Sequence, residues 1–133
     1  MQRSVKRTDT SAEQVFDYYL AMLADDLPEP EKNYRFGKDG DPRFEIDRAF
    51  PADKVGVEIQ GGTWTKGAHS SGVGLRRDYI KNNLAVIYGW KMLYFTPDML
   101  ERDPIGCIWQ VRELVKLPFA ERIDNAVSTI QST

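Results

Sequence analysis

Two neighbouring segments of the chain, residues 43–50 and 55–60, alternate between apolar and polar positions. This alternation is the period of a β-strand, and the Pro-Ala-Asp-Lys sequence between the two segments is typical of a turn. The pattern therefore predicts an antiparallel hairpin with one face in the core and the other in solvent. In the first strand it places Ile46 and Phe50 on the core side, on the face opposite Asp47.

The predicted hairpin brings carboxylates together. If Phe50 pairs with Val55 across the turn, antiparallel counting sets Asp47 opposite Glu58. Directly opposed side chains stand roughly 5 Å apart. Two carboxylates at that distance repel each other unless a positive charge lies between them, and a hard cation such as Mg²⁺ takes oxygen ligands from few protein groups. The pair predicts a metal site, with a solvated strand face as the open alternative.

The remaining apolar positions predict helices around the strands. Ser11 reads as the N-cap of a first helix, and Gly89 as the C-cap of a long one. A helical crossover between the third and fourth strands predicts that these two run parallel, which gives a mixed sheet. The expected elements are a helix from 11 to before Pro28, strands at 34–36, 43–50 and 55–60, a helix from Ser71 or Gly72 to Tyr88, a strand at 91–95, and two helical pieces over 98–131 separated at Pro118. The expected buried stripe of the long helix is Val73, Ile80, Leu84 and Ile87.

Composition narrows the class of protein only moderately. A chain of 133 residues fits one domain, and 41% hydrophobic with 29% charged residues is ordinary for a globular protein. The formal charge of −2 neither indicates nor excludes a nucleic-acid partner, because the local distribution of charge decides. One cysteine and one histidine are too few for a disulfide or a usual zinc site and are typical of an intracellular protein. No apolar run is long enough to span a membrane.

The order of elements, with Asp47 on one strand and Glu58-Ile-Gln60 on the next, resembles the PD-(D/E)xK nuclease superfamily. The closer likeness is to small, possibly phage-borne domains similar to very-short-patch repair endonucleases, and it spans roughly residues 11–97. It implies an α/β fold with a restriction-endonuclease-like αβββαβ core, a mixed four-stranded sheet flanked by helices, and a C-terminal helical extension over 98–131. The whole chain, 1–133, is then one nuclease domain. The matching residues are Asp47, Val55–Gly62, His69, Arg76, Asp78, Lys81 and Gly89–Thr96.

The resemblance implies a metal site for Mg²⁺ or Mn²⁺. Asp47, Glu58 and the Ile59 carbonyl would be ligands, and Glu13 matches a carboxylate that many members supply from the first helix. For Glu13, an acidic first-turn residue favoured by the helix dipole is an equal alternative. The chain departs from the family at Gln60, where the pattern has lysine. Lys81 is the candidate replacement, with a solvated helix lysine as the alternative.

Further residues are implied as contacts to substrate. His69 is a candidate general base or phosphate contact, and Trp64 stacks on a base or covers the edge of the sheet. Arg77 and Lys81 lie four residues apart on one helix face, so both reach a phosphate backbone. The expected nucleic-acid contacts are Arg76, Arg77, Lys81, Trp64 and Lys66.

The leading hypothesis is a metal-dependent DNA endonuclease in repair or recombination, in a host cytoplasm if phage-encoded. A small domain leaves little room for sequence readout, so branched, flapped, mismatched or single-stranded DNA is the expected substrate. Three alternatives remain open. A junction resolvase would need a homodimer. A nucleic-acid-binding module that has lost its chemistry is favoured by Gln60, and a hydrolase of other substrates is supported only by the carboxylate pair.

Overall fold

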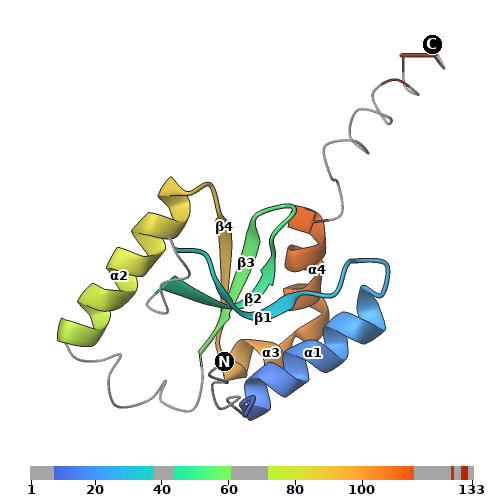
Figure 1. The fold of residues 1–133 in the computed structure, drawn as a ribbon. Helices are drawn as coiled ribbons and strands as arrows, with labels where there is room; N and C mark the ends of the chain where they lie inside the picture. Colours follow the sequence, from blue (N-terminus) through green and yellow to red (C-terminus); the bar gives the residue numbers. More distant parts are fainter. Residues whose placement is uncertain (1–7, 38–43, 61–71, 116–126, 128–129, 132–133) are drawn as a thin grey trace, which may run out of the picture.

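A four-stranded mixed sheet forms the centre of the protein, with helices on both faces (Figure 1). The computed structural model describes residues 8–37, 44–60, 72–115, 127 and 130–131. In Figure 1, α2 covers one face of the sheet, and α1, α3 and α4 lie on the other. In chain order the elements are α1 (Ser11–Leu23), β1 (Glu31–Arg35), β2 (Glu45–Phe50), β3 (Val55–Ile59), α2 (Gly72–Ile87), β4 (Lys91–Phe95), α3 (Pro97–Arg102) and α4 (Pro104–Val115).

The strand pairing confirms the predicted mixed sheet. The strands are ordered β1-β2-β3-β4, with β1–β2 and β2–β3 antiparallel and β3–β4 parallel. Phe50 pairs with Val55, as the alternation predicted. The crossover from β3 to β4 contains α2, and the connection turns into β4 at Gly89, whose φ of 90° suits glycine and few other residues.

The larger core lies between the sheet and the layer of α1, α3 and α4, and a smaller one lies under α2. Phe16, Val57 and Val111 are fully buried in the first, and Ala85 and Trp90 are buried in the second. Among the described residues, no helix is both long and apolar enough to cross a membrane.

The prediction that Ile46 and Phe50 share a face is wrong. Phe50 packs in the larger core, whereas Ile46 packs under α2 with Ala49 and Trp90. The alternation of β2 is therefore interrupted between Ile46 and Arg48, and Asp47 lies at the interruption. On β1, the residue at the matching position is Asn33, whose φ of 52° departs from extended strand geometry.

The predicted buried stripe of α2 is wrong at Ile80 and Ile87, whereas Leu84 is half-buried and the burial of Val73 lies outside the described part of the chain. Ile80 is 50% exposed and Ile87 is 73% exposed, while Ala85 is buried. The small side chain of Ala85 lets the helix approach the sheet closely, and the rotation that brings it inward also turns Lys81 toward β3. The charge of a nearly buried Glu58 needs a partner, and this orientation provides one.

Two helix boundaries differ from the prediction. Thr10, not Ser11, is the N-cap of α1. The segment that follows β4 contains two helices before Pro118 instead of one, because the α3 helix ends at Arg102 and Pro104 starts α4. Pro suits the first turn of a helix, where no backbone donor is needed. The helical piece predicted after Pro118 lies outside the described residues, except for positions 127, 130 and 131.

Candidate active site

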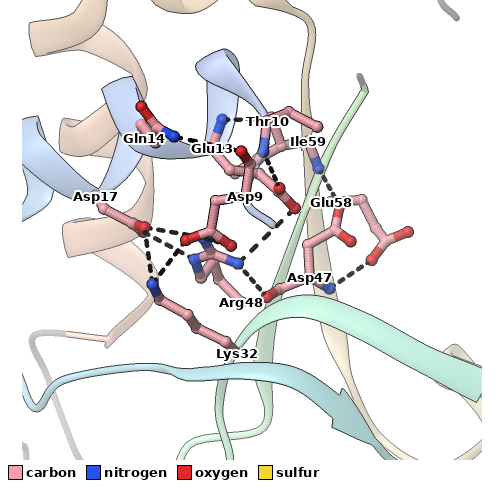
Figure 2. Close-up of polar contacts among 10 residues, drawn as sticks. All are labelled: Asp9, Thr10, Glu13, Gln14, Asp17, Lys32, Asp47, Arg48, Glu58 and Ile59. Carbon is pink, nitrogen blue, oxygen red and sulfur yellow. Dashed lines mark hydrogen bonds and ion pairs between the residues drawn. The ribbon is translucent and has the colours of Figure 1, made fainter. Parts of the chain in front are cut away.

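The candidate site lies where β2 and β3 part, next to the last backbone pair, Arg48 with Val57. Beyond this pair, the two strands are joined by hydrogen bonds between a carboxylate side chain and a backbone N–H (Figure 2). The Asp47 N–H donates to Glu58 Oε2 at 2.9 Å, and the Ile59 N–H donates to Asp47 Oδ2 at 2.7 Å. Each carboxylate is thus held by an amide of the opposite strand, and the predicted juxtaposition of Asp47 and Glu58 is confirmed.

Lys81 reaches this carboxylate pair from α2. Its Nζ lies 2.5 Å from Glu58 Oε1 and donates to the Glu45 carbonyl at 3.0 Å. The Lys81 and Glu58 side chains are 20% and 12% exposed, so water screens their attraction only weakly. These contacts exclude the alternative that Lys81 is a free, solvated lysine on the surface of the helix.

A polar cavity of about 250 Å³ opens at this point. Three carboxylates and one ammonium give it a negative balance that favours a cation. A larger hollow of about 330 Å³ lies at the connection from α1 to β1, but the carboxylate pair is not part of its lining. The lining of the smaller cavity consists of Asp47, Glu58, Ile59, Gln60, Asp78, Lys81, Asn82 and Tyr94.

Tyr94 is a site residue that the sequence analysis assigned no role. It pairs with Glu58 in the parallel register of β3 and β4, so the two side chains lie side by side on one face. Burial, together with the negative charges of Glu58 and Asp78, raises the pKa of the Tyr94 hydroxyl. The hydroxyl therefore remains a hydrogen-bond donor at neutral pH. The sequence contained a signal for Tyr94. Counting parallel pairs along the predicted strands 55–60 and 91–95 places Tyr94 beside Glu58.

Burial raises the pKa of Glu58 to about 6, and the neighbouring charge of Asp47 adds to the increase. Lys81 acts in the opposite direction through its charge and its hydrogen bond. The site therefore holds an excess of negative charge that the protein itself offsets only in part. A cation in addition to the Lys81 ammonium would offset the remaining negative charge.

This excess of negative charge predicts an unusual dependence of stability on pH. Because the folded-state pKa of Glu58 is above the usual 4.5, the folded protein binds a proton first as the pH falls, and acidification from pH 7.5 toward 4.5 stabilises it. The gain attributable to Glu58 is at most about 2 kcal/mol. Glu58→Gln lacks this gain. Urea unfolding of both proteins at pH 7.5, 6.0 and 5.0 measures the difference.

Parallel pH profiles of unfolding for the two proteins would contradict the assignment of the shift to Glu58. Two other carboxylates with shifted pKa values do not interfere in this window. Hydrogen bonding to Lys32 lowers the pKa of Asp9, and hydrogen bonding to Arg112 lowers the pKa of Asp26, so both titrate at more acidic pH.

Of the other predicted site residues, one lines the cavity, two lie on the exposed surface of α2, and three are not described by the structure. Gln60 lines the cavity, and its backbone N–H donates to the Phe95 carbonyl. Arg76 and Arg77 are exposed on α2. The predicted roles of Trp64, Lys66 and His69 lie outside the described residues.

Glu13 has a different environment from the carboxylate pair. Its Oε1 accepts from the Thr10 N–H at 2.8 Å, while the Glu13 N–H donates to Thr10 Oγ1, which completes a capping box. Its other oxygen lies 3.8 Å from Arg48. These contacts favour the helix-start reading of Glu13, and its role as a metal ligand stays a prediction.

The donor set suits Mg²⁺ better than a metal that needs a full protein cage. Among the described residues, no three His, Cys, Asp or Glu side chains form a group that could hold a metal ion. Mg²⁺ is commonly bound by one or two carboxylates and keeps several waters. Asp47, Glu58 and the adjoining Ile59 carbonyl provide oxygen donors of this kind, whereas a structural zinc site needs four ligands.

Comparison of the chain with protein-family models, with curated proteins and with solved structures found no match. The similarity to the PD-(D/E)xK superfamily therefore stays a prediction. The features that bear on function are the geometry of the carboxylate pair, the position of Lys81 and the polar cavity that these residues line.

Proposed function

We propose that the protein is a metal-dependent DNA endonuclease built on a restriction-endonuclease-like core. One observation carries the proposal. Asp47 and Glu58 face each other where two strands part, in a polar cavity, with the Lys81 ammonium 2.5 Å from Glu58. Two acidic groups that can hold a metal, and one cation that can offset charge on the phosphate, are the components of metal-assisted phosphodiester hydrolysis.

The residues take distinct roles in this proposal. Asp47 and Glu58, with the Ile59 carbonyl, hold Mg²⁺ or Mn²⁺. When bound, the metal supplies a water of lowered pKa and offsets negative charge on the scissile phosphate. Lys81 provides the positive charge that Gln60 cannot, because an amide is only a hydrogen-bonding group. The protonated Tyr94 hydroxyl donates to a phosphate oxygen in the same cavity.

DNA contacts outside the cavity come from α2. Arg76 and Arg77 are exposed on the helix whose Lys81 faces the site, so they contact phosphates next to the one that is cleaved. Phosphate contacts position a duplex without reading its sequence. The proposed substrate is accordingly DNA recognised by structure, such as a flap, a branch, a mismatch or a single strand, in repair or recombination.

A second candidate function is a nucleic-acid-binding module without chemistry. The close ion pair between Lys81 and Glu58 favours it, because it neutralises one of the two carboxylates from within the chain. Gln60 in the lining of the cavity is consistent with the same reading. In this candidate, Arg76 and Arg77 bind the phosphate backbone and no bond is broken.

Cleavage of a labelled DNA panel tests the proposal. The panel contains a single strand, a duplex, a flap, a mismatch and a four-way junction, each incubated with Mg²⁺, Mn²⁺ or Ca²⁺, with Glu58→Gln as the control. We expect cutting in Mg²⁺ or Mn²⁺ that the variant lacks. Binding to one substrate without cutting in any metal contradicts the endonuclease and supports the binding module. Cutting that is confined to the junction, by a dimer, identifies a resolvase.

A further inference from the structure

Arg48 is a completely buried arginine directly next to Asp47 in the chain, and its side chain is 0% exposed. It points toward Asp17 and Asp9, away from the Glu58 carboxylate (Figure 2). Its Nε and Nη2 donate to the two carboxylate oxygens of Asp17, both at 2.8 Å. Asp9 lies 3.3 Å from Nη2 and Glu13 lies 3.8 Å from Nη1. The guanidinium therefore connects β2 to three carboxylates that lie on α1 or just before it.

The guanidinium also binds the backbone of its neighbour in the chain, the proposed metal ligand Asp47. Arg48 Nη1 donates to the Asp47 carbonyl at 2.8 Å. The other polar group of the Asp47 backbone, its N–H, donates to Glu58. Both backbone polar groups of the proposed metal ligand are thus bound by charged side chains, and such bonds are stronger than neutral ones.

This arrangement is located where β2 departs from regular alternation. Ile46 and Arg48, two residues apart, lie on opposite faces of the sheet, although a regular strand would put them on one. The register between β1 and β2 includes Lys32 with Arg48 and Tyr34 with Ile46, and passes over Asp47. The Asp47 peptide therefore lies at a position that the paired residues of β1 and β2 leave out.

We propose that Arg48 is a positioning residue for Asp47. By holding the Asp47 carbonyl on the α1 side, it turns the Asp47 carboxylate toward β3, where Oδ2 accepts from the Ile59 N–H at 2.7 Å. Asp17 orients the guanidinium through its two bonds. The placement of α1 is thereby coupled to the geometry of the site. The catalytic consequence rests on the proposed endonuclease function, whereas the positioning itself is measurable without DNA.

The two-bond contact with Asp17 supports positioning over simple charge neutralisation. A paired carboxylate fixes the plane of a guanidinium, because two parallel donors meet two acceptors. Lys32 balances the surplus acid of the cluster, with its Nζ 2.8 Å from Asp9 and 3.6 Å from Asp17. Several groups therefore share the charge of the cluster, while the two parallel hydrogen bonds to Asp17 fix the plane of the guanidinium and with it the direction of Nη1 toward the Asp47 carbonyl.

Asp17→Asn is the primary test, because Asp17 is 29% exposed and its replacement keeps the volume of the side chain. Arg48→Met is the second variant, used if it folds. The first readout is the Ile59 amide in metal-free protein, by NMR. We expect its proton to move upfield and its hydrogen exchange to accelerate by about tenfold or more, as a charge-assisted bond is weakened.

The second readout is the divalent-ion affinity and kinetics of the same variant. Loss of a residue that orients a metal ligand costs roughly 10- to 100-fold in metal affinity or activity. We expect weaker Mn²⁺ binding and a lower kcat with an unchanged KM for DNA. The matched control is Asp26→Asn, which also removes a carboxylate from an arginine, here Arg112 on α4, but lies away from the site. It should change neither the Ile59 amide nor kcat.

An Asp17→Asn protein that is less stable but keeps the Ile59 amide signal and Mn²⁺ affinity of the wild type would overturn the proposal, because Arg48 would then only join β2 to α1. Asp17→Glu keeps the charge and should restore most of the Ile59 signal. If wild-type protein cuts no DNA, the endonuclease fails, yet a shifted Ile59 amide in Asp17→Asn still supports the positioning role.

Discussion

Asp47→Asn should reduce metal-dependent cleavage by about 10³-fold, and Glu58→Gln should do the same, because either change removes an anionic ligand of the proposed metal site. The fold should persist in both variants. The side-chain amide that each substitution introduces keeps a carbonyl oxygen, which still accepts from the backbone N–H that the carboxylate bound; these bonds join β2 to β3 here. Single-turnover cleavage of the preferred DNA measures the loss, and fluorescence anisotropy measures binding.

Glu45→Gln is the matched control for these variants. Glu45 is also a half-buried carboxylate on β2, but its side chain lies 3.6 Å from Arg35 and is not part of the cavity lining. We expect its cleavage rate to stay within a few-fold of wild type. Retention of wild-type cleavage by Asp47→Asn or Glu58→Gln would remove the carboxylate pair from the mechanism.

Lys81→Met should lower kcat by about 10²-fold, since it deletes the only ammonium that lines the described cavity and could offset charge on a phosphate. It should also change the pH profile. Lys81 holds the pKa of Glu58 down, so without it that pKa rises above about 6, and the acidic limb of the cleavage profile moves to higher pH. Single-turnover rates between pH 5.5 and 8.5 measure both effects.

Lys54→Met is the corresponding control, because the Lys54 Nζ also donates to a backbone carbonyl, that of Tyr88, but directly after the C-terminal end of α2 and outside the cavity lining. It should cleave like wild type. If Lys81→Met cleaves normally and binds Mn²⁺ more tightly, Lys81 only neutralises Glu58 and takes no part in chemistry. That result would leave the two carboxylates and the Tyr94 hydroxyl as the proposed catalytic groups.

The two experiments also separate the endonuclease from the binding module. In an endonuclease, the carboxylate variants keep DNA affinity and lose turnover. In a binding module, removing Asp47 or Glu58 takes negative charge away from a surface that meets phosphates, so affinity rises, and there is no turnover to lose.

The sequence by itself determined β2, β3 and β4 and the register of β2 with β3, while β1 extends over Glu31–Arg35 instead of the predicted 34–36. Alternation has a period of two, so it locates a strand and, with a short turn, fixes which residues are opposed; Phe50 with Val55, and hence Asp47 with Glu58, followed from counting. A helix between β3 and β4 determined that these strands are parallel. The alternation and the short turn are local features of the sequence, and the direction of β4 follows from the length of its connection to β3. All of these can be read along the chain.

Only the tertiary structure decided which way several side chains face. The apolar pattern of α2 pointed to Ile80 and Ile87, but the helix rotates to bury Ala85 and to give Glu58 its partner Lys81, because an unpaired buried charge costs more than exposed apolar surface. Likewise, the alternation of β2 assigned no role to Arg48, and its burial depends on carboxylates that α1 supplies from more than 30 positions earlier in the chain. Such contacts join distant segments, so no local periodicity records them.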